Sequence, residues 1–419
     1  MENVVDRTIT HYQNNGFRSL IRSAPKFVQR QILESIVQKA VQPYYSQIML
    51  DSNELKHRSE VFYELQVSQE DISMKINEEV APLKGNKDLQ HNYSPRYSYT
   101  QPFVAMIPDV VVAGPDAVAI TDDGKVLADP TDPVPNYSTQ GRLAQSIIRT
   151  VSSSPFSVGA PLLQGKSPST KTTEEAVAIL HSRWNNYYHW MLEHLLKLQG
   201  IEEYERKTGK TVKLIIPPDP SPYVTESLKL MGYDKNEYIE WNQDVLRANN
   251  LILPSFPSPR PESIRWMKNR ITPDSGTIES TSADKWIYIS RQKMNKRKII
   301  NYGEFSDLLN KYGIESVACE DISLEEEINL FKNVDGIIGP HGAGLSSIVW
   351  GENIQLIEIF NNVIKAPYYV LCYILDHDYT AFSAKPIKGK TNPRNYNIEV
   401  NIQEFEALIK NYVGQSNES

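Results

Sequence analysis

The chain has 419 residues, more than the about 250–300 residues at which a single hydrophobic core stops growing, so at least two domains are expected. Hydrophobic residues make up 40% of the sequence and charged residues 23%, which is typical of a globular protein and argues against a disordered chain. The formal net charge of −7 disfavours a nucleic-acid-binding protein, because that function needs a basic surface to neutralise phosphates.

Cysteine content and hydrophobicity indicate the compartment. The only two cysteines, Cys319 and Cys372, cannot form a disulfide framework, which favours a reducing environment. The N-terminus lacks the basic and apolar regions of a signal peptide, and no uncharged apolar run approaches the roughly 20 residues that span a bilayer. We therefore expect a cytoplasmic protein, either soluble or peripheral at the inner face of the membrane.

Residues 1–90 are predicted to form an N-terminal helical extension. Within residues 10–40, apolar side chains recur at roughly helical spacing from Phe17 to Val37, interleaved with arginines and lysines. A basic amphipathic helix of this kind can lie on an anionic membrane. It can equally be an accessory helix packed on the body of the protein, and both interpretations stay open.

From about Gln101 the pattern changes to strand. Apolar runs at 103–107, 110–113 and 117–120 precede the turn Asp122-Asp-Gly-Lys125, which is followed by another short apolar pair. Asp-Gly between apolar runs is a strong hairpin signal.

Strands and helices then alternate in two series. The first series has expected strands at 176–180, 213–216 and 251–253 and helices at 187–199 and 224–231. The second has expected strands at 286–289, 334–338 and 355–359 and helices at 302–312, 323–332, 345–350 and 368–375. Prolines at 254, 257, 259 and 261 separate the two. This arrangement predicts an α/β protein with two Rossmann-like domains, at 91–260 and 261–390, and a C-terminal tail helix at 391–419.

A glycine-rich turn provides the strongest site signal. Gly339-Pro-His341-Gly-Ala-Gly344 stands between an apolar strand and a helix. Glycines let the backbone approach a ligand closely, and the start of a helix presents free N–H groups. Turns at the carboxyl ends of parallel strands are where such sheets bind phosphates, and His341 adds a donor. The alternative is a tight turn whose glycines serve packing.

A basic segment provides the second signal. Ser290 and Arg291 end a predicted strand, and Arg297 and Asn301 follow. Arginine binds phosphate oxygens with fixed bidentate geometry, so the two arginines could neutralise a diphosphate without a metal. A solvated basic turn is the alternative.

The third signal is a possible catalytic base. On the helix that follows Asn186, His189 and Glu193 are four residues apart and therefore share a face. A carboxylate or imidazole placed in this way can act as a general base that takes a proton from a hydroxyl group. Glu193 is the first candidate and His189 the second, whereas a structural His–Glu pair is the alternative.

Together these segments resemble the family 61 glycosyltransferases, which include bacterial capsular-polysaccharide enzymes and eukaryotic enzymes that transfer xylose or N-acetylglucosamine. An N-x-x-H-W-like segment is matched by Asn186, His189 and Trp190. The pattern S-R followed by R-x-I-x-N is matched by Ser290, Arg291, Arg297, Ile299 and Asn301. The G-P-H-G-A motif is matched by Gly339 to Ala343, and a V-I-E-like strand by Ile357 and Glu358. The resemblance spans roughly residues 100–385.

The resemblance implies a GT-B fold, with the two domains facing a cleft, an inverting mechanism and no obligatory metal or cofactor. The donor would be a nucleotide-diphosphate sugar, with a UDP-sugar as the first expectation, and the acceptor a glycan or lipid-linked glycan in polysaccharide or glycoconjugate synthesis. The expected substrate-binding residues are Asn186, Ser290, Arg291, Arg297, Asn301, His341, Gly342, Ala343, Gly344 and Glu358. Of these, Glu358 is expected to accept from ribose hydroxyls.

Two other functions stay open at this point. One is a non-catalytic module that binds nucleotide sugars or glycans. The other is a metal-dependent GT-A transferase, because Asp376 and Asp378 have the spacing of a metal-binding D-x-D motif.

Overall fold

The computed structural model describes residues 49–50, 52–65, 72–73, 96–97, 102–127, 139–242, 245–255, 259–272, 285–361, 367–389 and 393–413. The amphipathic segment at 10–40 lies outside these residues. In the described part of the chain, no helix is both long and apolar enough to cross a bilayer.

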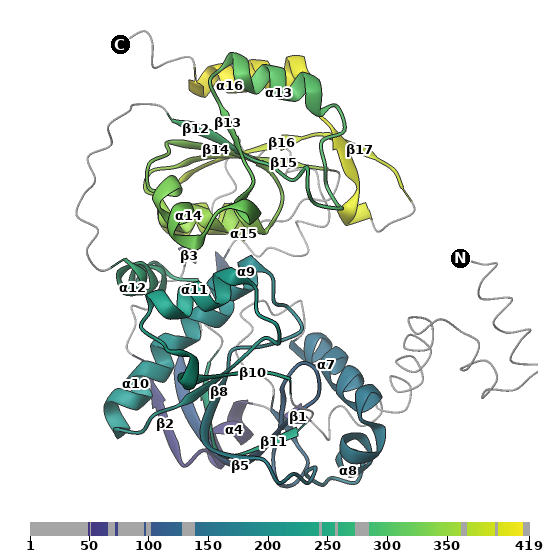
Figure 1. Ribbon diagram of the computed structural model, residues 1–419, viewed down its shortest axis with the longest axis vertical. Helices are drawn as coiled ribbons and strands as arrows, with labels where there is room; N and C mark the ends of the chain where they lie inside the picture. The colour runs from purple at the N-terminus through teal and green to yellow at the C-terminus, as the bar shows by residue number, and fades with distance from the viewer. Residues whose placement is uncertain are drawn as a thin grey trace, which may run out of the picture.

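These residues form two lobes, each built on one main sheet (Figure 1). We call residues 49–272 the N-terminal lobe and residues 285–413 the C-terminal lobe. The mixed α/β class predicted from the alternating pattern is confirmed, and parallel strand pairs occur in both sheets.

The N-terminal lobe contains a nine-stranded mixed sheet in the order β1-β7-β6-β5-β11-β8-β9-β10, with β2 also paired to β5. Its strands are β1 Met49–Leu50, β2 Val61–Glu64, β5 Phe103–Ala113, β6 Val118–Ile120, β7 Val126–Leu127, β8 Thr173–Ile179, β9 Lys213–Ile216, β10 Tyr238–Glu240 and β11 Val245–Pro254. A separate pair is β3 Ile72–Ser73 with β4 Arg96–Tyr97. Strands β11, β8, β9 and β10 are parallel, whereas β5 is antiparallel to β11, β2 and β6.

The helices of this lobe are α4 Ser52–Arg58, α7 Thr139–Ser153, α8 Ala160–Leu163, α9 Tyr187–His189, α10 Leu198–Thr208, α11 Pro222–Leu230 and α12 Pro261–Ile271. The shorter elements are the π-helices η3 Pro155–Gly159 and η4 Trp190–His194 and the 3₁₀-helices η5 Leu195–Lys197 and η6 Lys235–Glu237.

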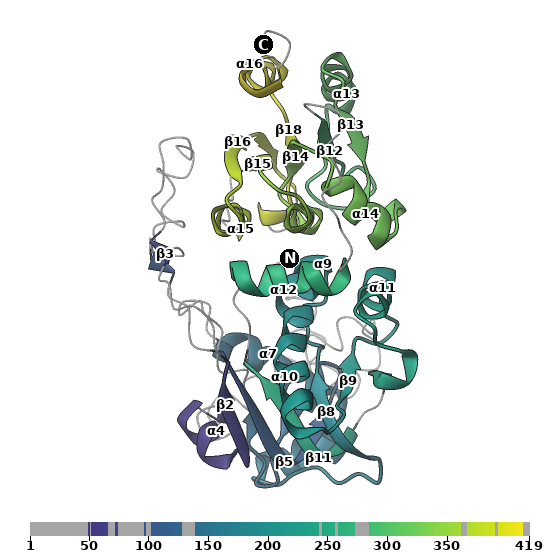
Figure 2. The ribbon, with the colours of Figure 1, turned by 90° about the vertical axis from the view of Figure 1, so that its left-hand side faces the viewer.

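The C-terminal lobe contains five parallel strands in the order β13-β12-β14-β15-β16. They are β12 Trp286–Ile289, β13 Glu315–Val317, β14 Gly336–Pro340, β15 Gln355–Phe360 and β16 Asp378–Ser383, and a small hairpin pairs β17 Lys385–Ile387 with β18 Asn397–Glu399. The helices are α13 Tyr302–Lys311, α14 Leu324–Phe331, α15 Pro367–Leu375 and α16 Ile402–Val413, with 3₁₀ turns η7 Cys319–Asp321, η8 Ala343–Trp350 and η9 Pro393–Asn395. Figure 2 shows α13 and α16 on the face away from the N-terminal lobe and α14 and α15 on the face toward it.

Three segments contact a part of the protein other than the domain to which the sequence analysis assigned them. Strand β2 pairs with β5, so part of the predicted extension belongs to the N-terminal sheet. Helix α12, expected in the second domain, is held to the N-terminal lobe by Arg270, which contacts Glu202 and the carbonyl of Met231. Helix α16 places Phe405 in the core of the C-terminal lobe beside α13, so the predicted tail helix is part of that lobe.

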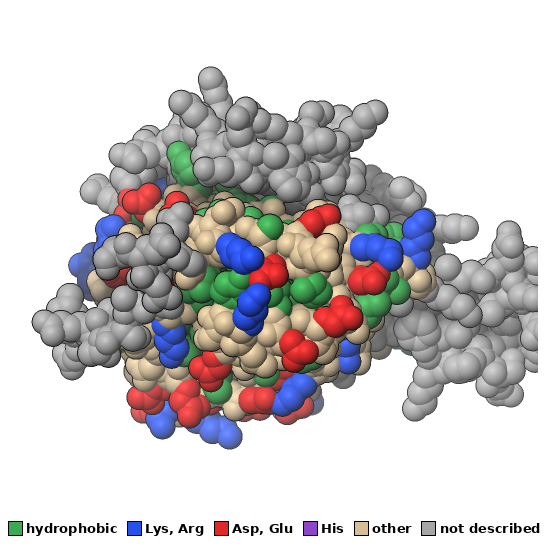
Figure 3. Space-filling view, turned by 90° about the horizontal axis from the view of Figure 1, so that it is seen from above, with side chains coloured by type: hydrophobic (Ala, Val, Ile, Leu, Met, Phe, Trp, Pro, Cys, Tyr) green, Lys and Arg blue, Asp and Glu red, His purple; other side chains and the backbone are tan. Residues whose placement is uncertain are grey.

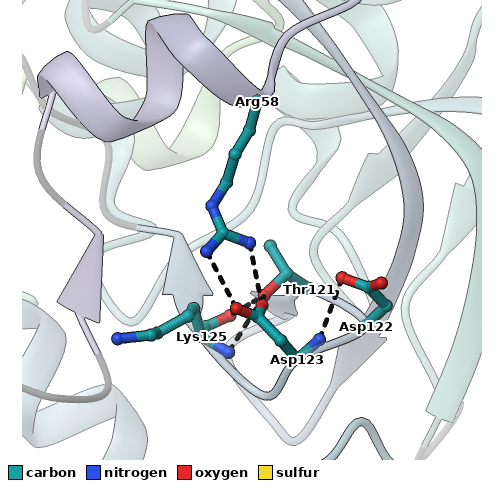
Figure 4. A network of polar contacts seen from close by, with 5 residues as sticks. All are labelled: Arg58, Thr121, Asp122, Asp123 and Lys125. Carbon is teal, nitrogen blue, oxygen red and sulfur yellow. Dashed lines mark hydrogen bonds and ion pairs between the residues drawn. The ribbon is translucent and has the colours of Figure 1, made fainter.

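The Asp-Gly turn between β6 and β7 forms as predicted. Gly124 has φ 74°, and a Cβ there would lie 2.5 Å from the backbone nitrogen of Lys166, so glycine is required. Arg58 of α4 forms a bidentate pair with Asp123 of this turn (Figure 4). The hydrogen bonds from Arg58 are the largest cause that lowers the pKa of Asp123 to about 2.

The lobes contact each other through polar groups on several elements. The pairs are Leu324 N with Glu226 Oε2 at 2.8 Å, Trp350 Nε1 with Tyr187 Oη at 3.3 Å and Lys268 Nζ with Gly351 O at 3.4 Å. At the opposite end of the C-terminal lobe, acidic and basic side chains are interspersed among the described residues (Figure 3).

Candidate active site

The basic segment and the glycine-rich turn meet at one edge of the C-terminal sheet. Strands β12 and β14 are parallel neighbours, with Tyr288 opposite Ile338, so their carboxyl ends lie side by side. Arg291 follows β12 and His341 follows β14. This is the edge at which parallel sheets bind ligands.

Arg291 lies directly against the glycine-rich turn. A Cβ on Gly342 would stand 2.0 Å from Nη1 of Arg291 and 2.8 Å from its Cζ. The backbone of Gly342 is extended, so glycine is needed here for space and not for a left-handed conformation. The absent side chain leaves the room that the guanidinium occupies.

Arg297 reaches the same region from the loop after β12. Its φ of 58° is left-handed, which is uncommon for a residue other than glycine and is worth noting at a candidate site. Burial lowers the pKa of Arg297 to about 10, and the neighbouring charge of Arg291 lowers it further. Burial likewise lowers the pKa of Arg291.

Both guanidinium groups have an unsatisfied nitrogen in the described part of the chain. The Nε atoms of both are buried and have no hydrogen-bond partner among the described residues, and neither guanidinium forms an ion pair with a carboxylate there. Two adjacent, partly buried cations are unfavourable in the protein alone when neither forms a direct ion pair. Such an arrangement is suited to an anion with several oxygens.

His341 is oriented by a buried carboxyl group. Its Nδ1 and Glu358 Oε1 share a hydrogen bond of 2.5 Å, and Glu358 Oε2 accepts from Tyr379 Oη at 2.8 Å. Burial raises the pKa of Glu358 well above its usual range, against the hydrogen bond from Tyr379 and the charge of Arg297. The ring of His341 also stacks on Phe360. The bond to Glu358 occupies Nδ1 of His341 and so sets the orientation of its ring.

This environment changes the role expected for Glu358. The side chain is fully buried and both carboxylate oxygens are engaged within the protein. A contact with ribose hydroxyls is therefore incompatible with its position, and Glu358 is a positioning group for His341.

A short helix follows the turn, as predicted over 345–350, and it is the 3₁₀-helix η8. Tyr368 of α15 donates to the carbonyl of Gly342 at 2.6 Å, which fixes the turn. Ala343 and Gly344 form the first residues of η8, and a Cβ on Gly344 would lie 3.2 Å from Cγ2 of Ile289. The first N–H groups of η8 are thus held at the same sheet edge as Arg291.

Three of the expected substrate-binding residues have local structural contacts. Asn301 pairs with the backbone of Val400 through both ends of its amide, at 2.8 and 3.0 Å. Ser290 accepts from Gln292 N within its turn, and Asn186 caps α9 by accepting from His189 N. These residues shape the loops that carry Arg291, Arg297 and His189.

His189 and Glu193 form a close pair on an irregular helix. His189 Nδ1 and Glu193 Oε2 are 2.6 Å apart, and both side chains are mostly buried. The predicted helix over 187–199 is present, but it passes through the π-helix η4 and the 3₁₀-helix η5 before α10. Single π-turns inside helices are frequent at functional sites.

A series of aromatic contacts connects this pair to the glycine-rich turn across the lobes. The ring of His189 lies 5.3 Å from that of Tyr188, and Tyr188 lies 5.9 Å from Tyr368. Tyr368 is in turn 5.4 Å from the ring of His341. The two sets of predicted site residues therefore converge where the lobes meet.

Asp376 and Asp378 lie elsewhere. Asp378 pairs with Gln355 at the amino ends of β16 and β15, whereas His341 follows the carboxyl end of β14. The D-x-D segment is thus at the opposite edge of the sheet from Arg291. In the part of the chain that the structure describes, no three His, Cys, Asp or Glu side chains are grouped as metal ligands would be.

A buried polar cluster between the lobes was not predicted from the sequence. Glu327 of α14 is buried and accepts from Ser347 of η8 and from Tyr187 of α9. Tyr187 in turn accepts from Trp350 Nε1. The cluster thereby connects the helix that carries His189 to the helix that follows the glycine-rich turn.

Glu327 predicts a pH dependence of stability. Burial raises its pKa, against the hydrogen bonds from Ser347 and Tyr187. The native state therefore holds a proton that the unfolded chain releases near pH 4.3, and its stability falls as pH rises from there through the folded pKa. In Glu327→Gln this loss is absent, so the excess stability of the variant over the wild type should grow with pH.

Denaturant midpoints between pH 4 and 7.5 measure this difference. Glu325→Gln, on the exposed face of the same helix, is the matched control and should follow the wild type. If the denaturant midpoints of the wild type and Glu327→Gln change with pH in parallel, the pKa of Glu327 is not raised in the folded protein.

At this sheet edge two buried arginines and the glycine-rich turn lie together, and the tyrosine contacts join them to the His189–Glu193 pair. Residues 187–355 match the model of the family described as Glycosyltransferase 61. The matched segment contains both arginines, the glycine-rich turn and the His189–Glu193 pair. This match supports a glycosyltransferase of family 61, the family that the motifs resemble. A search of curated proteins gave no match.

Proposed function

We propose that this protein is an inverting, GT-B-type glycosyltransferase that moves a sugar from a nucleotide-diphosphate donor to a hydroxyl of a glycan acceptor. A UDP-sugar is the first expected donor, and the reaction needs no metal. The acceptor is a glycan or lipid-linked glycan in cytoplasmic polysaccharide or glycoconjugate synthesis, with the enzyme soluble or peripheral at the membrane. The observation that carries this proposal is the pair Arg291 and Arg297 beside Gly342, whose buried Nε atoms have no hydrogen-bond partner among the residues that the structure describes.

The donor diphosphate is placed against these arginines. Negative charge builds on the departing diphosphate as the bond from the sugar C1 to the phosphate oxygen breaks. Guanidinium groups and backbone N–H groups that are already in place stabilise that charge without reorganisation. Nε2 of His341 adds a contact to a phosphate or ribose oxygen, with its ring held by Glu358.

The acceptor hydroxyl attacks C1 from the side opposite the leaving group, so the configuration inverts in one displacement. Its proton passes to Glu193, which His189 contacts at 2.6 Å. His189 is the alternative base. Support for this placement comes from the ring contacts that join His189 to His341 through Tyr188 and Tyr368.

Ligand-induced thermal shifts test the donor site. UDP, other nucleoside diphosphates and their sugars are compared in the presence of EDTA. A ligand at about 100 times its Kd stabilises the native state by roughly 2.7 kcal/mol, so at least one diphosphate should raise the Tm clearly. Donor hydrolysis with the same panel then separates an enzyme from a non-catalytic binding module. No shift with any nucleotide, or turnover only with added metal, would contradict the proposal.

A further inference from the structure

An exposed tryptophan stands beside the His189–Glu193 pair. Of the six tryptophans, four are buried and Trp266 is half-buried, whereas Trp184 is 40% exposed. Its ring centroid lies 5.9 Å from that of His189. A large aromatic side chain that stays in contact with water forgoes the stabilisation that burial would give. Its exposure therefore suggests a role in binding.

The backbone around Trp184 is held firmly. Ser182 Oγ donates to the carbonyl of Trp184 at 3.0 Å and accepts from its N–H at 3.1 Å. His194 Nε2 also contacts that carbonyl, at 3.0 Å. Because a carbonyl only accepts, Nε2 of His194 carries the proton.

His194 is well suited to donate this hydrogen bond to the carbonyl of Trp184. It is buried, and burial lowers its pKa well below the usual range, so the ring stays neutral and keeps one donor nitrogen. The result is a rigid support, on the loop between β8 and α9, for an aromatic ring next to the proposed base. Rigid support of this kind reduces the entropy lost on binding a ligand.

We propose that Trp184 is the platform on which the acceptor sugar stacks, with its reacting hydroxyl directed to the His189–Glu193 pair. This inference rests on the proposed function and adds the residue that binds the acceptor. The negative face of an indole ring attracts the weakly positive C–H face of a pyranose, while the hydroxyl groups at the sugar's rim stay available for hydrogen bonds. Arg183, whose guanidinium lies 5.9 Å from the indole ring, is placed to contact such hydroxyls or an acidic substituent.

A glycan occupant is favoured over an apolar protein surface by the surroundings. Trp184 is flanked by the exposed polar residues Arg183, Asn185 and Asn186. An apolar contact surface would need neighbouring apolar side chains, whereas one ring among hydrogen-bonding groups is the composition that a sugar requires.

The test uses the full chain on immobilised glycans, with UDP binding measured by calorimetry on the same preparations. Wild type is compared with Trp184→Ala, Trp184→Phe and Phe156→Ala. Phe156 is the matched control, because it is an aromatic residue of the same lobe that is 88% exposed and far from any predicted role. The Trp184→Phe variant keeps an aromatic ring at this position, so it still tests the proposal if Trp184→Ala is too unstable to be measured.

Trp184→Ala should weaken glycan binding by about tenfold or more and Trp184→Phe by less, while Phe156→Ala binds as wild type does. UDP binding should be the same in all four proteins. If Trp184→Ala and the wild type bind glycan equally well, Trp184 is not the residue on which the acceptor stacks. The proposal is also contradicted if the wild-type protein binds UDP but binds no glycan. Failure of the wild type to bind UDP would instead count against the proposed donor site.

Discussion

Arg291→Ala is expected to lower the rate of sugar transfer by about 100- to 1000-fold, in the range seen when one pre-positioned group that stabilises transition-state charge is removed. The folded protein should be at least as stable as the wild type. Burial lowers the pKa of Arg291, and its charge opposes that of Arg297, so its removal relieves two unfavourable terms. Loss of activity together with unchanged or higher Tm is the signature of a group kept for ligand binding.

Gly342→Ala provides a second approach to the same arginine. The added methyl group would overlap Nη1 of Arg291, so the guanidinium must move although its charge is retained. UDP affinity should therefore fall while the backbone, extended at this position, accepts alanine without strain. Gly303→Ala is the control, because a Cβ there meets no atom within 4 Å. Wild-type UDP affinity and turnover in both Arg291→Ala and Gly342→Ala would remove Arg291 from the mechanism.

The sequence predicted the placement of Arg291 and His341 because that placement follows from strand ends. Once two apolar runs are taken as parallel strands of one sheet, the residues after them share an edge, whatever the order of the other strands. The resemblance to the family 61 motifs then indicated which residues at that edge are candidates for the site. The capping box of α14, with Ser323 and Glu326, was similarly predictable because it depends on four consecutive residues.

Contacts between distant segments were not predictable in this way. The role of Glu358 depends on Tyr379 of the neighbouring strand, and the position of Glu327 depends on contact between the two lobes. A sequence pattern marks Glu358 as polar within an apolar strand but does not say what meets it. Helix α12 begins at the proline where the second domain was expected to start, and its contacts with both lobes, through Arg270 and Lys268, depend on residues far away in the sequence.

The irregular helix after Asn186 also lay beyond the pattern. Helical spacing predicts that His189 and Glu193 share a face, and their 2.6 Å contact agrees with that. The π-turn in which Glu193 lies cannot be distinguished from an α-turn by apolar spacing, because the two differ by about one residue in hydrogen-bond spacing. The contact between His189 and Glu193 was therefore predictable, whereas the local geometry of the helix that carries them was not.

Glu193→Gln should reduce turnover by about 100- to 10 000-fold, the range that positioned proton transfer contributes. The amide has the same shape and can still contact His189 Nδ1, so the fold and UDP affinity should be unchanged, but it cannot accept the acceptor's proton. Glu203→Gln, ten residues further along the same helical segment, is the matched control. Its carboxylate pairs with Arg206 at the surface, and such pairs contribute little.

The same series decides between the two candidate bases. If Glu193 takes the proton, His189→Gln should lower turnover less than Glu193→Gln does, because His189 then only orients the carboxylate. If Glu193→Gln turns over at nearly the wild-type rate while His189→Gln does not, the base is His189. In both cases the proton is accepted on the helix that begins at Tyr187, whose hydroxyl group contacts Glu327 across the lobes. Normal rates in both variants would mean that the acceptor binds away from this helix. That result would also contradict the acceptor-binding role proposed for Trp184.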